Sequence, residues 1–456
     1  MSLPAPSLWL RELGRDRWRP QLDGSLEADV AIVGGGLSGL WTAHAVLDAR
    51  PGASVVVLEA ERVGWGASGR NGGWASALFP VSWGTVARSF GPEGARALRT
   101  RLVENLDEIE AALGDDAADV EWHRAGTVVA ARSEEQWRQL VADVREEQAL
   151  GLRDPGVLLD ARGVRARLAI DGAVGGVFEP VCASVHPAKL VELLARRLEQ
   201  RGGLVLERSR VHSGAPGVLV GVGGRVRASQ VVWATESYSA AEPRWHRALA
   251  PVASQIIATA PLSAAQRERL GNPEAGLTFS DGRRLVIYGQ LRADGRVIFG
   301  GRGAPYRFGS GVEFATEVGA RMRLGLAATL AELLREAGPI EIEASWGGTI
   351  GVSRDWYPRV LHDPSERIVF VGGYAGDGVA MTRLAGQLAA AYATGVRLDP
   401  DLAVILGRPV RRWEPEPMRW LGVNVGLGLT RLGDALEGRP HAQRAVDVLR
   451  GAVLGR

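Results

Sequence analysis

Three glycines and a glutamate near the N-terminus have the types and spacing that bind a dinucleotide. Gly34, Gly36 and Gly39 stand in G-x-G-x-x-G order, and Glu59 follows Gly39 by about twenty residues. The first glycine allows a tight turn, the second lets a pyrophosphate approach the backbone, and the third lets a helix pack closely on a strand. A carboxylate at the position of Glu59 can accept hydrogen bonds from the ribose hydroxyls of an adenosine.

The elements that must position these residues can be predicted from the flanking sequence. Residues 29–33 are mostly apolar, as in a parallel strand buried on both faces, and residues 37–47 are typical of a helix. The apolar run before Glu59 predicts a second strand. Phosphates would lie at the N-terminus of the helix, where free N–H groups favour anions. The remaining contacts expected in this unit are Leu37, Ser38 and Ala60.

The segment 62–74, RVGWGASGRNGGW, is rich in glycine and small residues. Consecutive free N–H groups in such a segment can surround a phosphate or a flavin ring. A nicotinamide-binding domain would normally continue here into another helix and strand. The segment could also be an ordinary polar loop, with Arg70 at the entrance to the site. We favour cofactor contacts, which are expected at Gly66, Ala67, Ser68, Arg70, Asn71, Gly72 and Gly73.

This segment resembles the FAD-binding loop of the D-amino-acid-oxidase-like flavoproteins, which include glycine oxidase, sarcosine oxidase and γ-glutamylputrescine oxidase. Residues 367–390, RIVFVGGYAGDGVAMTRLAGQLAA, are similar to the closing motif of that family, in which a helix N-terminus faces the flavin. The segments VHPAKLVELLARRL and GGTIGVSRDWYPRV also resemble family motifs. All of these segments follow the family's order between about residue 28 and about residue 400.

The resemblance implies an α/β chain (α+β overall), in which a Rossmann-type FAD-binding domain carries an inserted antiparallel-sheet substrate domain. The expected segments are an N-terminal arm (1–27), the FAD-binding domain (28–85, 151–248 and 345–400), the substrate domain (86–150 and 249–344) and a helical tail (401–456). Further FAD contacts are implied at Val211, Ala234, Thr235, Gly348, Gly373, Gly376, Asp377, Gly378, Val379 and Ala380. Asp377 has the alternative of capping the helix that begins near Gly378.

The way in which FAD is held also follows from the resemblance. In the sarcosine-oxidase branch, a cysteine bonded to the flavin stands where this chain has Trp346 and Gly347–Gly348. The one cysteine, Cys182, lies outside that motif, so we expect FAD to be bound without a covalent link. Trp346 is either a core residue or, as we favour at this position, a residue that faces the flavin ring.

The substrate expectation depends on two arginines that are missing. The α-amino-acid oxidases of the family hold the substrate carboxylate with one arginine in the segment read here as SWGGTIGV and one in the closing motif. This chain has Gly347–Gly348 and Gly376 there. Because a guanidinium is the usual partner of a carboxylate, we expect an amine with no carboxylate on the reacting carbon. Arg302 or Arg354 could substitute, although a surface salt bridge is the expected fate of each.

Two tyrosines and one histidine could touch the substrate. Tyr374, directly after the glycines of the closing motif, is the better candidate for a hydrogen bond to an amine. Tyr288 lies on a predicted strand, so one side of it is expected to face the core. His186 precedes Pro187 at a predicted helix start, where a cap is favoured over a catalytic role.

Composition excludes several other classes of protein. The net charge is +2 without a basic tract, so no nucleic-acid partner is expected. The histidines have no paired spacing, so no metal site is expected, and a single cysteine fits a reducing compartment. The N-terminus lacks the apolar core of a signal peptide, and the apolar run 420–430 is too short to span a bilayer. We therefore expect a soluble, cytoplasmic protein.

Three functions remain open at this level. The favoured one is an FAD-dependent amine oxidase, in which an amine C–H delivers hydride to flavin N5, the imine hydrolyses and oxygen is reduced to hydrogen peroxide. The second is a D-amino-acid dehydrogenase that reduces a quinone at the membrane, with Trp413 and Trp420 as an interfacial anchor. The third is a flavin-binding protein without turnover. The amine, the acceptor and the oligomeric state stay undetermined.

Overall fold

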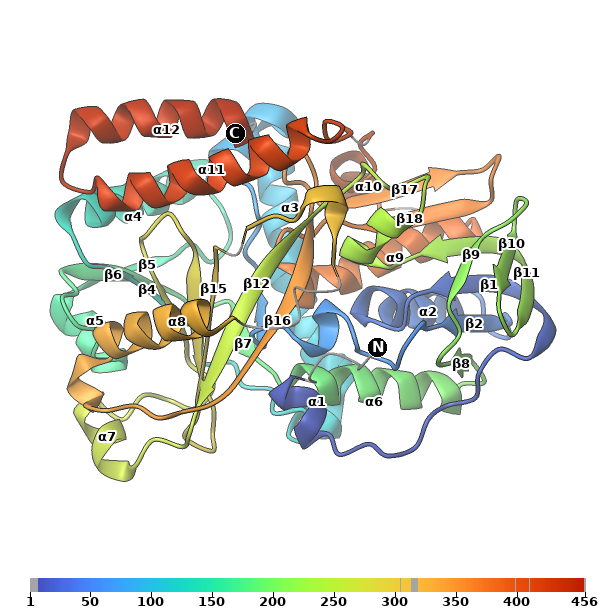
Figure 1. Cartoon of the computed structure of the whole chain (residues 1–456), viewed down its shortest axis with the longest axis horizontal. Helices are drawn as coiled ribbons and strands as arrows, with labels where there is room; N and C mark the ends of the chain where they lie inside the picture. Colours follow the sequence, from blue (N-terminus) through green and yellow to red (C-terminus); the bar gives the residue numbers. More distant parts are fainter. Residues whose placement is uncertain (1–6, 304, 313–318, 398, 410, 455–456) are drawn as a thin grey trace.

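The computed structural model describes residues 7–454 except 304, 313–318, 398 and 410, and within them it forms two large sheets with helices around them (Figure 1). The first sheet has the order β17-β18-β11-β1-β2-β8, and all neighbours from β18 to β8 are parallel. Its strands are β1 (Gly24–Val33), β2 (Val55–Leu58), β8 (Leu204–Leu206), β9 (Val211–Ser213), β10 (Val218–Gly221), β11 (Gly224–Trp233), β17 (Arg359–Asp363) and β18 (Ile368–Gly372).

The central strand β1 is buried on both faces, which explains its continuous apolar run. Val30 and Ile32 pack into the core beneath the helices, whereas Ala31 and Val33 pack into a second core with Leu219 of β10. The helices on the first side are α2 (Leu37–Ala49), α3 (Trp83–Leu113), α6 (Pro187–Gln200), α9 (Gly378–Thr394) and α10 (Pro400–Leu406). The predicted strand and helix at 29–33 and 37–47 are therefore present; the strand begins five residues earlier than expected and the helix ends two residues later.

The second sheet has the order β16-β12-β15-β14-β13-β4-β6-β5 and is antiparallel except for the parallel pair β4–β13. Its strands are β4 (Thr127–Ala131), β5 (Val157–Asp160), β6 (Gly175–Glu179), β12 (Ala250–Thr259), β13 (Thr278–Asp281), β14 (Ile287–Leu291), β15 (Val297–Arg302) and β16 (Ile342–Val352). One face packs on α8 (Ala320–Leu333) through a core that includes Phe279, Phe299 and Leu330. The helices α4 (Glu134–Leu150), α5 (Ala161–Arg167) and α7 (Ala264–Arg269) lie at its edge.

Two of the expected domain boundaries differ from the sheet pairing. Residues 157–179, which we expected in the FAD-binding domain, form β5 and β6 and pair with β4 of the second sheet. The boundary expected after residue 344 falls inside β16, whose whole length pairs with β12. These differences in pairing arise because the sequence of a strand carries no local sign of the sheet that it will join.

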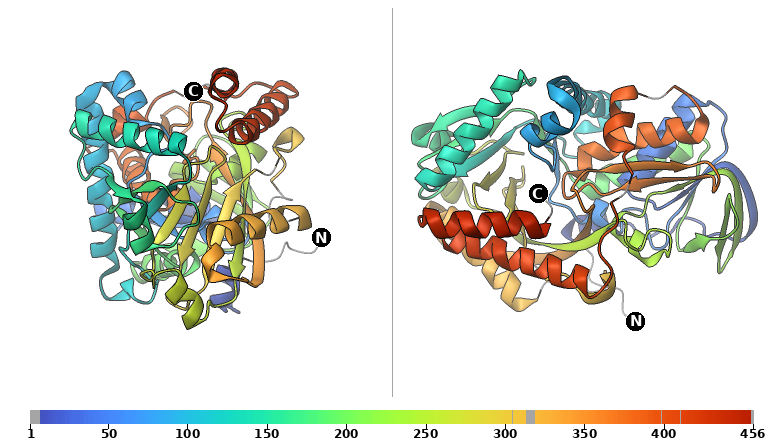
Figure 2. Two further views of the ribbon diagram at one scale, coloured as in Figure 1. Left: turned by 90° about the vertical axis from the view of Figure 1, so that its left-hand side faces the viewer. Right: turned by 90° about the horizontal axis from the view of Figure 1, so that it is seen from above.

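Both ends of the chain pack on this body. The N-terminal arm contains α1 (Leu8–Glu12), and its Trp9 is completely buried. The strands β3 (Trp74–Ser76) and β7 (Cys182–Ser184) pair with each other in a separate antiparallel two-stranded sheet. The C-terminal tail ends in a helical hairpin, α11 (Met418–Ala435) and α12 (Pro440–Leu454), whose helices run side by side along one edge of the molecule (Figures 1 and 2).

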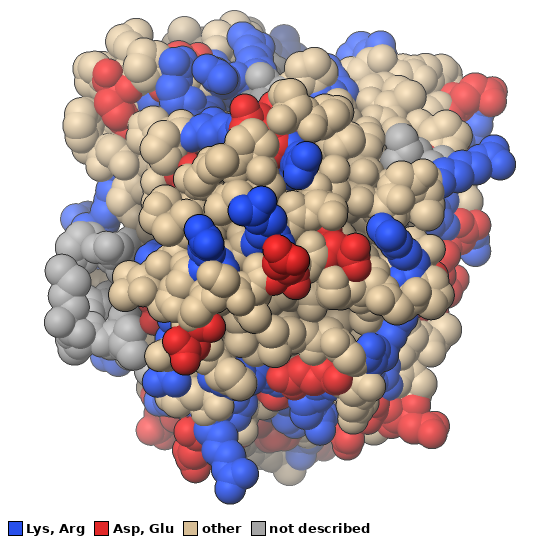
Figure 3. Space-filling view, turned by 90° about the vertical axis from the view of Figure 1, so that its right-hand side faces the viewer, with Lys and Arg blue, Asp and Glu red and all other residues tan. Residues whose placement is uncertain are grey.

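The charge distribution agrees with the low net charge. On the face that carries the right-hand elements of Figure 1, basic and acidic side chains are interspersed (Figure 3). Among the described helices, none is both long and apolar enough to cross a membrane.

Candidate functional site

The predicted glycine turn joins β1 to α2 and is closely packed. Gly34 has a φ of +112°, and a Cβ there would lie 2.6 Å from the carbonyl oxygen of Ala234. A Cβ on Gly39 would collide with the carbonyl oxygen of Gly34, so that the helix can approach the strand only with glycine at this position. Gly36 is the N-cap residue of α2.

The loop 62–74 covers this helix N-terminus. The N–H of Leu37 donates to the Ser68 hydroxyl oxygen at 2.9 Å, and a Cβ on Gly36 would lie 2.8 Å from the same oxygen. Ser68 belongs to a short 3-10 helix, η1 (Ala67–Gly69). The structure thus brings together the glycine turn and the glycine-rich loop that the sequence singled out separately.

Glu59 lies at the end of β2, beside the turn. Its carboxylate accepts the N–H of Gly35 at 2.7 Å and that of Glu61 at 2.9 Å. Burial raises the pKa of Glu59 to about 7, and the neighbouring carboxylates of Glu61 and Glu207 act in the same direction. Ala60 follows directly, and the backbone of Ser209, two residues before Val211 at the start of β9, bonds the Glu59 carbonyl at 2.8 Å.

Arg70 pins the loop to the second sheet. Its guanidinium donates to the carbonyl oxygens of Trp65 at 2.8 Å and Gly347 at 3.3 Å, and it lies over the Trp65 ring. Burial lowers its pKa. Because Arg70 is only 1% exposed, it does not line an entrance. A Cβ on Gly348 would lie 3.3 Å from the Arg70 side chain, so this glycine makes the contact possible.

Asn71 organises the rest of the loop. Its amide nitrogen donates to the carbonyl oxygens of Ala67 and Ser68, and its amide oxygen accepts the N–H of Gly73. Gly66 and Gly72 leave room for aromatic neighbours: a Cβ on Gly72 would lie 2.6 Å from the ring of Tyr288. Asn71 thus shapes the backbone of the loop from within.

The N-terminal arm closes the outer side of the same loop. The Ser7 hydroxyl donates to the carbonyl oxygen of Gly69 at 2.5 Å, and the Trp9 indole N–H donates to that of Asn71 at 2.9 Å. His186 caps α6 by accepting the N–H of Lys189, and its other ring nitrogen lies 3.3 Å from Glu12. The cap role expected for His186 is therefore present.

Trp346 lies behind the loop. It is 1% exposed, its indole N–H donates to the carbonyl oxygen of Arg70 at 2.9 Å, and its ring packs edge-on against Trp9. These contacts make Trp346 a core residue, which was one of the two alternatives. They do not fit the position facing the flavin ring that we favoured. The sequence could not show this, because the contact with Trp9 joins segments far apart in the chain.

Tyr288 of β14 packs its ring between the loop and the second sheet. Its hydroxyl lies 2.8 Å from that of Ser254 on β12, and burial raises its pKa. The ring meets Trp74 edge-on at 6.3 Å between centroids. Tyr288 therefore belongs to the sheet surface that faces the loop.

The closing motif forms a second glycine turn, between β18 and α9. Gly373 and Gly376 have positive φ angles of +82° and +111°. Tyr374 is buried between them and α2, with its hydroxyl 2.8 Å from the Ser38 hydroxyl, and burial raises its pKa. This geometry favours a positioning role for Tyr374 over contact with a substrate.

Helix α9 begins at Gly378 without a side-chain cap. Asp377 occupies the N-cap position, but its side chain makes no capping hydrogen bond, so the cap expected for it is absent. Val379 and Ala380 are buried in the first turn, and the carbonyl oxygen of Ala380 accepts from Asn105 at 2.9 Å. The first turn of α9 is thus not capped by the side chain of Asp377, and an anion is another common partner of the N–H groups at a helix N-terminus.

Arg302 reaches the second turn from the end of β15. Its guanidinium donates to the carbonyl oxygen of Ala375 at 2.7 Å, and a Cβ on Gly376 would collide with it. Arg302 was expected to form a surface salt bridge. No carboxylate of the described residues pairs with it. Arg354 does pair, with Glu414 at 3.1 Å, but it is 9% exposed in side chain and not on the surface.

Glu236 was missed by the sequence analysis. It opens the 3-10 helix η3 (Glu236–Ala241) just after Ala234 and Thr235, and its carboxylate accepts the N–H groups of Gly351 and Gly373, each at 3.1 Å. Burial raises its pKa to about 7. Its position directly after a parallel strand was the one available signal, since ligands of such sheets bind beyond the carboxyl ends of the strands.

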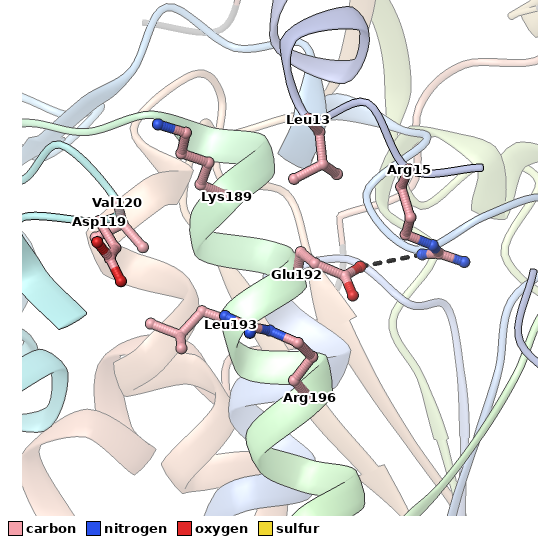
Figure 4. Close-up of a pocket in the computed structure, with 8 residues that line it drawn as sticks. All are labelled: Leu13, Arg15, Asp119, Val120, Lys189, Glu192, Leu193 and Arg196. Atoms are coloured by element: carbon pink, nitrogen blue, oxygen red, sulfur yellow. Dashed lines mark hydrogen bonds and ion pairs between the residues drawn. The ribbon is translucent and has the colours of Figure 1, made fainter. Parts of the chain in front are cut away.

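Most of the predicted cofactor residues share one edge of the first sheet. Gly34, Glu59, Ala234 and Gly373 each follow the carboxyl end of a parallel strand, and the loop 62–74 lies beside them. The cavity of about 250 Å³ in Figure 4 lies elsewhere, between the arm and α6, and is lined by Arg15, Lys189 and Glu192 among others. Among the described residues, no cluster of side chains is arranged to hold a metal ion.

Comparisons with known proteins agree with this arrangement. The profile of the FAD dependent oxidoreductases matches residues 29–392. γ-Glutamylputrescine oxidoreductase of Escherichia coli is 28% identical over 379 residues, 82% of this chain and 85% of that protein. A probable oxidoreductase OrdL of Haemophilus influenzae is 29% identical over 401 residues, 86% and 88% of the two chains.

Solved structures give the fold. Glycine oxidase from Geobacillus kaustophilus superposes with a TM-score of 0.66 at 22% identity, over 84% of this chain and 99% of that one. L-Proline dehydrogenase from P. horikoshii gives 0.66 at 16% identity, over 84% and 96%. The predicted fold class, α/β with a dinucleotide-binding domain and a second sheet, is confirmed.

Proposed function

This chain belongs to the family of FAD-dependent oxidoreductases, and we propose that it oxidises an amine whose reacting carbon carries no carboxylate. The family and the relatives together indicate an FAD enzyme that acts on amines or amino acids. We further propose that oxygen accepts the electrons and is reduced to hydrogen peroxide.

The observation that carries the proposal is the meeting of two helix N-termini. The glycine turns before α2 and α9 are joined by the Ser38–Tyr374 hydrogen bond, and both turns lie at the carboxyl edge of the parallel strands. Helix N-termini attract anions because their N–H groups are free and their dipoles are aligned. The pair is suited to a cofactor that has a pyrophosphate at one end and an electron-accepting ring at the other.

The residues at this edge fit FAD. Gly36 leaves the space above α2 that a Cβ would fill, and the Glu59 carboxylate beside the turn would accept hydrogen bonds from the adenosine ribose. Gly373 and Gly376 give the second turn its positive φ angles beside α9. Bound FAD would supply the hydride acceptor for the carbon next to the amine nitrogen.

We propose that FAD is held without a covalent bond. Cys182 lies in β7, completely buried, with its thiol 3.4 Å from the Thr278 hydroxyl. Burial raises the pKa of this thiol to about 12, so it stays protonated and is a poor nucleophile.

The surface of the second sheet would orient the substrate. Tyr288, Ser254 and the small residues of β15 and β16 face the loop 62–74, and Trp74 and Trp65 lie beside them. Aromatic faces pack alkyl chains and attract cationic amines, and they hold a free carboxylate poorly. This lining supports an amine substrate, as in the name of the Escherichia coli relative.

One observation favours a second candidate, an amino-acid oxidase. Arg302 places a guanidinium at the closing turn, and no carboxylate of the described residues neutralises it. A guanidinium in that state can bind a substrate carboxylate in bidentate fashion. Under this reading Arg302 takes over the role of the two arginines that are missing from the family positions.

Product analysis tests the proposed reaction. The purified yellow protein would be incubated in air with simple and acylated diamines, and oxygen uptake, hydrogen peroxide and the carbonyl product would be measured together. The proposal expects peroxide and carbonyl in equal amounts. Substrate oxidation that needs added quinone and makes no peroxide would favour the dehydrogenase, and no oxidation of any amine or amino acid would favour a non-catalytic flavoprotein.

A further inference from the structure

The exposed surface of the C-terminal hairpin has an unusual composition. Among the described residues between 418 and 453, each exposed one is apolar, glycine, arginine or histidine, and the acidic residues Asp434, Glu437 and Asp447 are half-buried. These residues include Met418, Trp420, Leu421, Val425, Leu432, Val448 and Leu449, whose exposed fractions range from 38% to 72%. Apolar surface gathered in this way marks an interaction site more often than scattered exposed residues do.

The apolar side chains of α11 form a continuous stripe. Met418, Leu421, Val425 and Leu432 recur at spacings of three, four and seven residues, so they share one face of the helix. The opposite face holds buried residues such as Gly426 and packs on the body. The stripe is therefore the face of α11 that the described residues leave exposed.

The acidic residues of the hairpin turn toward the body instead. Asp434 accepts the N–H groups of Arg284 and Leu285, and Asp447 pairs with the guanidinium of Arg284 at 3.0 Å. The carboxylate of Glu437 is bonded to Ser133 and Gln136. The acidic side chains of the hairpin are thus half-buried and bonded to the body of the molecule.

The outer surface keeps its positive charges. The exposed arginines of the hairpin are Arg431, Arg439 and Arg444. Within the part of the chain that the structure describes, none of them forms an ion pair with a carboxylate. Arg431 donates to the carbonyl oxygen of Gly303. The hairpin thus combines an apolar stripe with Arg439 and Arg444, which no carboxylate of the described residues neutralises.

We propose that this face of the hairpin docks on an anionic phospholipid surface. The stripe would enter the boundary between headgroups and acyl chains, while the arginines pair with lipid phosphates and Trp420 lies at the interface. The hairpin lies along the surface without crossing it, which agrees with the shortness of its apolar run. Trp413, also considered as an anchor, is 4% exposed and bonds the carbonyl oxygen of Val352, so it takes no part.

Charge decides between lipid and a second copy of the chain. A two-fold dimer would place the same arginine-bearing face against itself and would bring like charges together. A lipid surface of opposite charge satisfies the arginines and covers the apolar stripe at once. The inference rests on the hairpin alone and does not depend on which substrate the enzyme oxidises.

Vesicle flotation of the yellow holoenzyme tests the proposal. One set of vesicles is phosphatidylcholine alone and the other contains phosphatidylglycerol as well. We expect binding to the second set only, weakened by salt because exposed charges are screened. The double variant R439E/R444E should bind about tenfold more weakly or worse, and V425S/L449S should also lose binding.

A charge-reversal variant outside the hairpin serves as the control. The exposed arginines Arg162 and Arg227 lie outside the hairpin, and R162E/R227E should bind as the parent does. All variants should keep their flavin colour and turnover. Equal binding to both vesicle types, no binding to either, or a dimer that the hairpin variants dissociate would each overturn the proposal.

Discussion

The hydroxyl oxygens of Tyr374 and Ser38 lie 2.8 Å apart and join two glycine turns that are separated by most of the chain. Ser38 is in the first turn of α2, and Tyr374 lies just before α9. The two helices also pack against each other, with Gly386 of α9 close to the backbone at Trp41 and Thr42. The hydrogen bond therefore fixes the relative position of the two helix N-termini at the proposed FAD site.

Tyr374→Phe should weaken FAD binding by about 0.5–1.5 kcal/mol, the net worth of one hydrogen bond. The substrate KM should stay close to that of the parent, because the hydroxyl contacts α2 and not the substrate surface. The FAD dissociation constant and the KM are to be measured on the same preparations. Tyr392→Phe, at the far end of α9, is the matched control. A large rise in KM with unchanged FAD affinity would return Tyr374 to a substrate role.

Gly36→Val should abolish FAD binding and give a colourless protein. A side chain at this position would meet Ser68 and fill the space that the pyrophosphate needs. Gly325 is an exposed helical glycine with open space around its Cβ position, and Gly325→Val should stay yellow. A yellow Gly36→Val variant with normal FAD content would show that the cofactor lies elsewhere.

Glu59→Ala should weaken FAD binding by about 1.5–3 kcal/mol, the scale of charge-assisted hydrogen bonds. Burial raises the pKa of Glu59 to about 7, so the carboxylate loses its charge as the pH falls through 7. Ribose hydroxyls bind the charged form better, so FAD affinity of the parent should rise with pH across this range and level off above it. Titrations at several pH values would show this slope, and Glu59→Gln should lack it.

The sequence was sufficient where the chemistry is local. The turn at Gly34–Gly39 and the carboxylate of Glu59 depend on neighbours that are close in the chain, and glycine is the residue type that such turns require. Trp346 shows the limit, since its burial is decided by Trp9, a residue of the N-terminal arm. The positions of Arg302 beside Gly376 and of Glu236 beside Gly351 likewise depend on how two sheets meet, which no local pattern records.

Glu236→Gln should change how stability depends on pH. Burial raises the pKa of Glu236 from 4.5 to about 7. Its contribution to stability is therefore fully present below the unfolded pKa and is lost as the pH rises through about 7. Glutamine does not ionise, so the stability of the parent relative to the variant should fall by roughly 1–3 kcal/mol between mildly acidic and mildly alkaline pH.

Thermal unfolding at both pH values measures this difference. Glu27→Gln, which removes an exposed carboxylate, is the control and should track the parent. A constant difference between the parent and Glu236→Gln at all pH values would mean that Glu236 does not titrate in this range.

The central claim, oxidation of an amine without an adjacent carboxylate, is tested most directly by reduction of the bound flavin without oxygen. The protein would be mixed anaerobically with simple diamines, γ-glutamylated diamines, glycine, sarcosine and D-alanine, and the loss of flavin absorbance would be timed. We predict that a diamine or its acylated form reduces the flavin faster than every amino acid. Faster reduction by glycine, sarcosine or D-alanine, lost in Arg302→Ala, would contradict the claim and identify Arg302 as the carboxylate ligand.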